Sequence, residues 1–151
     1  MGITTITGDD TIILYGRVLT DLADGDTSTI TFPNDLVTMK TGKNNNTIYS
    51  KNANGTNGEA VLRVMKGSSD DRFLQGKLDA QMRDFPAATL ATGSFVKRLG
   101  DGVGKIVNET YVLAGGVISK NVESKDNQDG DTSQSVSVYN FKFANVVRSM
   151  Q

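Results

Sequence analysis

Most of this chain alternates between apolar and polar residues with a period of two, which is the pattern of β-strands with one covered face. The clearest run spans residues 60–65, and residues 27–32 alternate in the same way. Further runs occupy residues 11–19, 90–99, 109–123 and 132–147. The sequence therefore predicts a mainly β protein.

Three of these runs carry extra information. Residues 11–19 alternate throughout, which predicts one continuous strand, and Asp24-Gly25-Asp26 predicts a tight turn after it. In the last run the apolar phase changes near Tyr139, which predicts either a β-bulge there or a strand that is apolar on both sides. Residues 111–118 are also apolar on both sides. Such strands in a small domain need a partner that covers their outer face.

One segment has helical spacing instead. Ser69 is the expected N-cap, because its hydroxyl can accept a hydrogen bond from an amide of the first turn. Asp70 and Asp71 follow at positions where the helix dipole favours negative charge. Phe85-Pro86 ends the pattern. The sequence predicts one substantial helix over residues 69–83, whose apolar face consists of Phe73, Leu74, Leu78 and Met82.

Residues 41–58 are polar and rich in Asn and Gly. A loop of this length without structure is uncommon inside a small domain, and such loops are usually functional or disordered. Ile48 and Tyr49 in its middle favour an extended β-hairpin arm that reaches a neighbouring subunit. A surface loop without regular structure is the alternative.

Composition narrows the function. At 151 residues we expect one domain, residues 1–151. The chain has no Cys and no His, which excludes thiol nucleophiles, disulfides, Ser-His-Asp machinery and imidazole metal ligands. We therefore expect no enzyme, no cofactor and no metal site. A net charge of −1 argues against general nucleic-acid binding. No signal-peptide pattern is visible and no apolar run approaches membrane-spanning length, so we expect no membrane association.

Three motifs resemble binding or catalytic sites but are better explained as turns or helix starts. Residues 125–130 superficially resemble a calcium loop, but Lys125 and Val136 stand where the EF-hand requires acids. Residues 100–105 resemble a phosphate loop, but the spacing fails and a hairpin turn is expected. The acid pairs Asp9-Asp10 and Asp70-Asp71 are read as a solvated turn and a helix start.

Several segments in fixed order carry a family resemblance. A hairpin over residues 13–26 is followed by Pro33-Asn34-Asp35 and then by the Gly42-Lys43 turn. The loop, strand and helix of residues 48–80 come next, and residues 117–122 and 139–143 form the closing strands. This order and spacing resemble the tail tube proteins of bacteriophages with contractile tails.

The resemblance implies an antiparallel β-sandwich or barrel with one flanking helix and a long extended loop or hairpin arm. It implies hexameric rings whose inner strands join into one continuous barrel. Stacked rings form a hollow conduit in the virion tail, through which the genome passes without specific binding. The implied partners are further copies of the chain and the sheath, tape-measure, baseplate and tail-terminator proteins. Synthesis would take place in the cytoplasm of a bacterial host.

Two sets of site residues follow from this resemblance. The loop of residues 41–58 is expected to contact the next ring, so its deletion over residues 44–57 should abolish stacking. The ring-to-ring candidates are Lys43, Asn44, Asn46, Ile48, Tyr49, Lys51 and Asn54. A conduit for DNA should be hydrophilic and preferably acidic, since basic residues would hold phosphates. The acidic candidates for the lumen are Asp9, Asp10, Asp21 and Glu59.

Other functions remain open at this point. The chain could be a non-contractile tail tube, a secretion-system tube or another virion component. An unrelated β-sandwich that binds sugar or acts as a carboxylate hydrolase is a further alternative. An aromatic content of 7% without Trp disfavours carbohydrate binding, because such modules usually present exposed aromatic rings.

Overall fold

The structure is a computed structural model that describes residues 2–23, 27–53, 55–125 and 135–150, with the side chains of residues 7–9 and 125 left out. The strands are β1 (Thr5–Leu14), β2 (Arg17–Leu19), β3 (Ser28–Thr31), β4 (Val37–Thr41), β5 (Thr47–Lys51), β6 (Gly58–Met65), β7 (Ala91–Gly100), β8 (Ile106–Ile118), β9 (Glu123–Lys125) and β10 (Val136–Met150). Helix α1 spans Ser69–Arg83, and a short 3-10 helix, η1, spans Phe85–Ala87.

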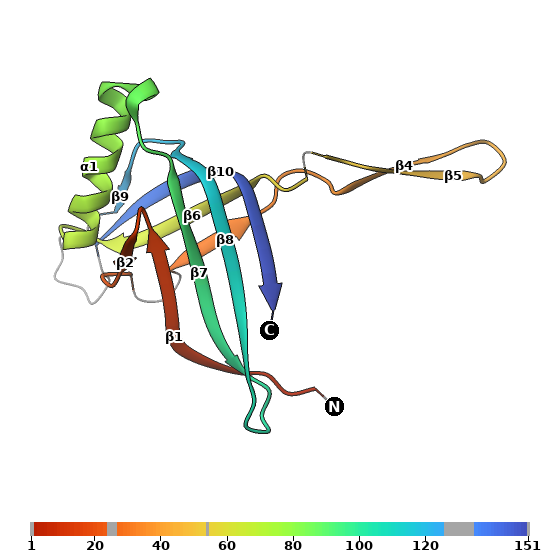
Figure 1. Cartoon of the computed structure of the whole chain (residues 1–151), viewed down its shortest axis with the longest axis horizontal. Helices are drawn as coiled ribbons and strands as arrows, with labels where there is room; N and C mark the ends of the chain where they lie inside the picture. The colour runs from red at the N-terminus through yellow and green to blue at the C-terminus, as the bar shows by residue number, and fades with distance from the viewer. Residues whose placement is uncertain (1, 24–26, 54, 126–134, 151) are drawn as a thin grey trace.

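The strands form one curled antiparallel sheet and one separate hairpin (Figure 1). The order in the large sheet is β2-β1-β7-β8-β10-β6-β3, with β9 beside β10. Strands β4 and β5 pair with each other and project from the molecule on the side away from α1 (Figure 1). The mainly β fold with one helix and an extended arm is confirmed, and the large sheet closes only into a half-barrel.

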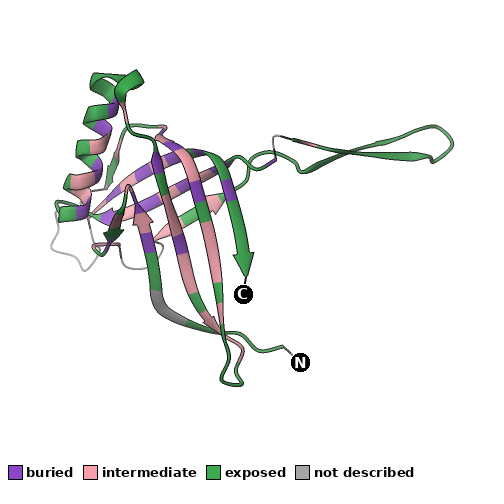
Figure 2. Ribbon diagram, viewed as in Figure 1, coloured by how far each residue is buried: buried purple, intermediate pink, exposed green. Residues whose placement is uncertain are grey.

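The core lies between α1 and the face of the sheet that the helix covers. Leu74 and Leu78 of the helix belong to one buried cluster with strand residues such as Tyr139 and Phe141. Figure 2 shows buried positions on both the helix and the strands. Burial of this apolar cluster is the main favourable term in the folding of the chain. The buried cluster consists of Ile12, Leu14, Leu19, Ala60, Leu62, Val64, Leu74, Leu78, Ala91, Phe95, Leu113, Ile118, Tyr139, Phe141, Phe143 and Val146.

The first long strand differs from its prediction. Residues 11–19 form the end of β1, a turn and β2, because Tyr15 and Gly16 have φ of 53° and 76°. Two consecutive residues with positive φ make the kind of two-residue turn that suits a β-hairpin. Period-two alternation runs through such a turn without interruption, which explains the error. The predicted turn at Asp24-Gly25-Asp26 lies outside the described residues.

Strand β10 changes its buried side at Ala144, and not at Tyr139 as predicted. Its register with β6 is unbroken up to Phe143, and there the odd-numbered residues are buried. Beyond this point Val146 is buried, and β10 pairs with β8 alone among the described strands. Gly115, with a φ of 67°, lies beside Ala144 at this change. The last part of β10 therefore no longer pairs with β6 and continues only beside β8.

Helix α1 has the predicted bounds but a different start and a different covered face. Its N-cap is Ser68, one residue earlier than expected. Met82 is 76% exposed, whereas Gln81 is buried. The Gln81 amide donates to the carbonyl of Ile118 (2.8 Å) and accepts from its N–H (3.0 Å), so it continues the hydrogen bonding of β8. A buried polar group with both bonds made carries little penalty.

Candidate assembly surfaces

The first candidate surface is the arm, which we define as residues 37–51, comprising β4, β5 and their turn. Every residue of both strands is exposed (Figure 2). Cross-strand partners share a face, so Val37, Met39 and Tyr49 lie on one side of the arm and Ile48 on the other. An isolated two-stranded hairpin is only marginally stable in water. The arm thus presents apolar side chains that its own chain does not cover.

The tip and the base of the arm are both built by specific contacts. At the tip, Asn45 has a φ of 66°, and the amide of Gly42 donates to the carbonyl of Asn46 (2.8 Å). At the base, the amide of Asn52 donates to the carbonyl of Leu36 (2.8 Å). A Cβ on Gly55 would come within 2.7 Å of the Leu36 side chain and 3.2 Å of the Asp35 carbonyl, so a larger residue there requires this junction to shift.

An open groove adjoins the base of the arm. It has a volume of about 520 Å³, and its lining includes Phe32, Leu36 and Val147, which are 43%, 65% and 49% exposed. Asp35 and Arg148 are the charged residues of this lining. The groove extends the exposed apolar surface from the arm to the end of β10.

The second candidate surface is a pair of free strand edges. Strand β1 pairs with β7 along one edge, and along its other edge it pairs with β2 only at residues 12–14. Among the described residues, that second edge is therefore unpaired over residues 5–11. Strand β10 is likewise paired on one side only from residue 147 onward. These edges flank one four-stranded sheet in the order β1-β7-β8-β10 (Figure 1). Such edges are templates for pairing with another chain.

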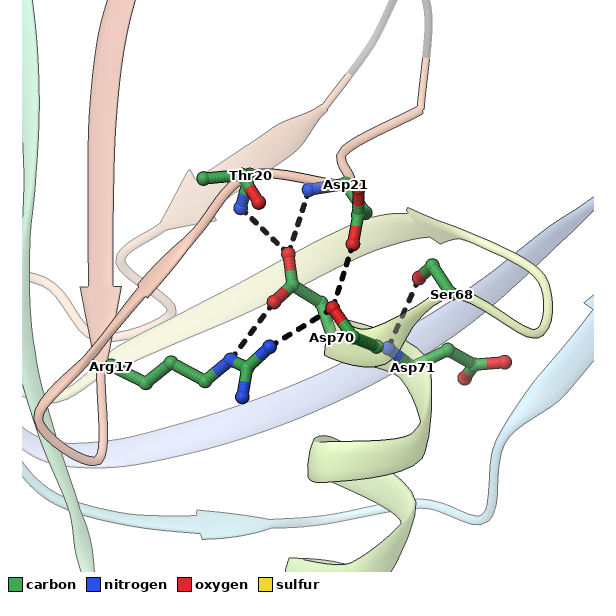
Figure 3. Close-up of polar contacts among 7 residues, drawn as sticks. Arg17, Thr20, Asp21, Ser68, Asp70 and Asp71 are labelled. Atoms are coloured by element: carbon green, nitrogen blue, oxygen red, sulfur yellow. Dashed lines mark hydrogen bonds and ion pairs between the residues drawn. The ribbon is translucent and has the colours of Figure 1, made fainter.

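A polar network fixes the start of α1 to the segment after β2 (Figure 3). The fully buried carboxylate of Asp70 accepts from Arg17 Nε (3.0 Å) and from the amides of Thr20 (2.6 Å) and Asp21 (2.7 Å). The hydroxyl of Ser69 donates to the carboxylate of Asp21 (3.0 Å). Asp70 lies in the first turn of α1 as predicted, and its neighbours supply the donors that its buried carboxylate needs.

The second acid of this pair, Asp71, connects the helix to β10. The hydroxyl of Tyr139 donates to Asp71 Oδ1 (2.6 Å), and the amide of Gly67 donates to Oδ2 (2.8 Å). Burial, and then the hydrogen bond to Asp71, raises the pKa of Tyr139 above its usual value of 10.0. Tyr139 is thus both a core side chain and a polar tie to the helix.

Changing Tyr139 to Phe should lower the free energy of unfolding by about 2 kcal/mol at pH 8, because a hydrogen bond to a charged acceptor is lost. Above pH 10 the unfolded chain releases the Tyr139 proton while the folded chain retains it, so wild-type stability falls by up to ~1.4 kcal/mol per pH unit. The variant lacks this effect, and the difference between the two proteins should shrink. Urea unfolding at pH 8 and pH 10.5 measures this.

The control for Tyr139 is Tyr49→Phe on the exposed arm, which should leave the stability unchanged at both pH values. Tyr15, whose pKa burial also raises, is present in every variant and cancels in the comparison. A constant difference between wild type and Y139F across the pH range would contradict the role given to the hydroxyl.

The predicted ring-to-ring residues lie together, whereas the predicted lumen acids do not. Lys43, Asn44, Asn46, Ile48, Tyr49 and Lys51 all belong to the arm, and Asn54 lies outside the described residues. Asp10 pairs with Lys97 (3.6 Å), Glu59 lies 3.9 Å from Lys142, and Asp21 belongs to the network at the helix start. The side chain of Asp9 is not described. The free edges and the Asp70 network are features that the sequence analysis missed.

The remaining motifs have structural roles where they are described. In the β7–β8 turn, the carboxylate of Asp101 accepts from the amides of Val103 (2.9 Å) and Lys105 (3.1 Å), so this is the expected hairpin turn. The calcium-loop segment falls largely outside the described residues. Within the described part of the chain, no group of three or more Asp or Glu is placed to hold a metal ion, and no helix is long and apolar enough to cross a membrane.

The fold occurs in solved structures of contractile injection systems. A chain of the PVC sheath–tube complex of an extracellular contractile injection system, in the extended state, matches with a TM-score of 0.63 at 8% identity over 94% of this chain and 87% of that chain. A chain of the tube-terminating cap of the anti-feeding prophage matches with a TM-score of 0.57 at 9% identity over 97% and 91%. A chain of the PVC sheath/tube terminator matches with a TM-score of 0.56 at 10% identity over 94% and 92%.

These structural neighbours agree with the resemblance to contractile-tail tube proteins, and at such identities the likeness concerns the fold. No protein-family model matches the chain, and no curated protein matches it by sequence.

Proposed function

We propose that this chain is the self-assembling subunit of a contractile-tail tube, in which hexameric rings stack into a hollow conduit for a genome. One observation carries the proposal: a single four-stranded sheet has a free stretch on each of its two lateral edges, while an arm without a partner projects from the same molecule. The two features provide one contact around a ring and another between rings. The role is structural and not enzymatic.

The strand directions support closure into a ring. Strands β1, β7, β8 and β10 are antiparallel in turn, so β10 runs opposite to β1. A neighbour's β1 placed beside β10 therefore continues the antiparallel alternation without a break. Because the two edges are different surfaces, the contact is heterologous, and heterologous contacts generate rings when the rotation closes.

The arm supports stacking. It contains Lys40, Lys43 and Lys51 and no acidic residue, in a chain whose net charge is −1, so the rest of the chain is net acidic. Its basic charge and its apolar side chains suit the acidic body of a copy in the next ring. Opposite charge on the two contacting surfaces favours the correct register of the rings.

The fold neighbours suggest the wider assembly. They are chains of a sheath–tube complex and of tube terminators, so we place sheath, baseplate, tape-measure and tail-terminator proteins among the partners of this chain. The proposed location is the virion tail, after synthesis in the bacterial cytoplasm. The tube of an extracellular injection system is the second candidate, because the neighbours come from such systems.

Negative-stain electron microscopy of the purified protein over a concentration series tests the proposal. Rings or hollow tubes that appear with rising concentration are the expected result. A protein that remains monomeric at every concentration, also in the presence of a preformed tube end, would refute self-assembly.

Changing Ile6 to Lys should raise the protein concentration needed for assembly about tenfold, which corresponds to ~1.4 kcal/mol per contact. Ile6 is 69% exposed on the free edge of β1, and a lysine there must lose water when a neighbouring strand pairs. Sedimentation at several concentrations measures the shift. Met82→Lys, which places the same charge on the exposed side of α1, is the control and should assemble normally. Equal behaviour of the two variants would exclude the β1 edge.

A further inference from the structure

We propose that the bare face of the four-stranded sheet is the inner wall of the tube and that an uncharged band of two cross-strand rows runs along the middle of this wall. The inference rests on the proposed function and assigns the lumen to residues that the acidic-lumen prediction does not include. The bare face is the side of β1, β7, β8 and β10 that α1 does not cover. Its uncharged band consists of Thr11, Ile13, Ser94, Val96, Thr110, Val112, Val147 and Ser149.

The strand register shows that these eight residues share one face. One row runs Ile13, Ser94, Val112 and Val147, with each residue paired to the next across the strands. The next row, two residues along, runs Thr11, Val96, Thr110 and Ser149. Direct cross-strand partners lie on the same side of a sheet, and so do residues two apart along a strand.

The composition of the bare face is unusual for an exposed sheet. In its two rows, half of the side chains are aliphatic and half carry a hydroxyl, and none is charged. Val112 is 51% exposed and Val147 is 49% exposed, so these side chains face solvent in the single chain. A water-exposed sheet face ordinarily carries many charged residues, which makes their absence from two complete rows informative.

Asp10, Lys97, Glu109 and Arg148 of this sheet lie on the opposite face, whereas Arg98, which is two residues beyond Val96 and pairs with Asn108, shares the bare face next to the two rows. On the opposite face, Asp10 is paired with Lys97 (3.6 Å) and Glu109 with Arg148 (2.7 Å). Asp10, Lys97, Glu109 and Met150 form one cross-strand row on that side. Asp10 and Glu109 are thus neutralised by basic partners and turned away from the bare face.

The bulk of the subunit determines which face points inward. Helix α1 and the core lie on the charged side, where a second layer of structure covers part of the sheet. When the free edges of β1 and β10 join neighbouring copies, the side with the second layer requires more room than the bare side. The bare face therefore lines the narrow interior of the ring.

An uncharged band on the wall suits the passage of a long charged polymer. Lysine or arginine on the wall would retain nucleic acid by its phosphates, and acids would retain a basic polypeptide. Hydroxyl groups keep the surface wetted, while short aliphatic side chains offer no specific hydrogen bond. The two uncharged rows should consequently hold neither kind of polymer, at low salt as well as at high salt.

Single cysteines test the assignment, because the chain has no native Cys. Val112→Cys is the wall probe, and Arg72→Cys on the exposed side of α1 is the outer control. In assembled tubes, Cys at position 112 should react with a small maleimide and lose its reaction with a maleimide on a large branched polymer. The control should react with both. In unassembled protein, both positions should react with both reagents.

The outcomes separate the two proposals. If no tubes form, the proposed function fails; if tubes form, the labelling decides the wall. Reaction of position 112 in tubes with the large reagent places it outside, and reaction with neither reagent places it in a subunit contact, so either result overturns the inference. In the companion test, Val112→Lys tubes should cosediment with short DNA duplexes at low salt, whereas wild-type and Met82→Lys tubes should not. Equal DNA retention by wild-type and V112K tubes would likewise overturn it.

Discussion

Replacement of residues 39–49 by an Asn-Gly turn should yield a folded monomer that forms no tubes. Thr38 and Ser50 are direct cross-strand partners, so a two-residue turn can close the shortened hairpin. The contacts at the base, between Asn52 and Leu36 and around Gly55, remain. The removed residues are exposed, and their loss should change the stability of the monomer little.

Electron microscopy and sedimentation detect assembly, and circular dichroism detects folding. A second variant keeps the arm but changes Val37, Met39 and Tyr49 to Thr, which retains the strand propensity and removes the apolar face. Ile48→Thr on the opposite side of the arm is its matched control. Long tubes from the shortened protein would refute the arm as the ring-to-ring contact.

The structure also shows why this replacement is a better test than deletion of residues 44–57. That deletion would remove Gly55 and Thr56 as well as β5, one of the two strands of the arm. Thr56 accepts a hydrogen bond from the amide of Val146 (2.9 Å), and Gly55 packs on Leu36. Loss of these contacts would disturb the sheet itself, so a failure to assemble would no longer report on the arm alone.

Local patterns predicted the helix and the arm because their signals lie within the segments themselves. Helix bounds follow from apolar spacing, early acids and Phe85-Pro86, and Ile48 and Tyr49 identified the arm. The prediction that Met82 belongs to the covered face was wrong. Helical spacing shows which residues share one face of the helix, but it does not show how far the sheet extends along that face. Gln81 was missed because its partner, Ile118, is distant in sequence.

The free edges and the bare face could not be predicted from the alternation alone. Alternation identifies the apolar side of a strand, but β8 is apolar on both sides. Which of its residues share a face with residues of other strands depends on the strand order and register. The pairing of Thr11 with Val96 and of Thr110 with Ser149 joins distant segments. Only this long-range register shows that the two rows carry no charge and that Asp10, Lys97, Glu109 and Arg148 lie on the other side.

Changing Asp70 to Ala should lower the free energy of unfolding by about 4 kcal/mol, a large share of the roughly 5–15 kcal/mol that stabilises a typical domain. The substitution removes the acceptor of Arg17 Nε and of the amides of Thr20 and Asp21. Arg17 is 39% exposed and can return to water, so most of the cost comes from the two amides that lose their partner. For a chain of this size Tm should fall by roughly 10 °C.

Urea unfolding followed by circular dichroism measures the change, and Asp79→Ala on the exposed side of α1 is the control, expected within about 0.5 kcal/mol of wild type. Asp70→Asn separates charge from geometry, because an amide keeps one acceptor oxygen but turns an NH₂ group toward at least one of the donors. Because the amides of Thr20 and Asp21 both donate to Oδ2, the asparagine oxygen can keep both bonds while its NH₂ group faces Arg17, so D70N should lose less stability than D70A. If D70A cost less than about 1 kcal/mol, the amides would have found other acceptors, and the network would not anchor α1. Because α1 covers the core side of the sheet, a protein with this anchor broken should also assemble poorly at temperatures where wild type still forms tubes.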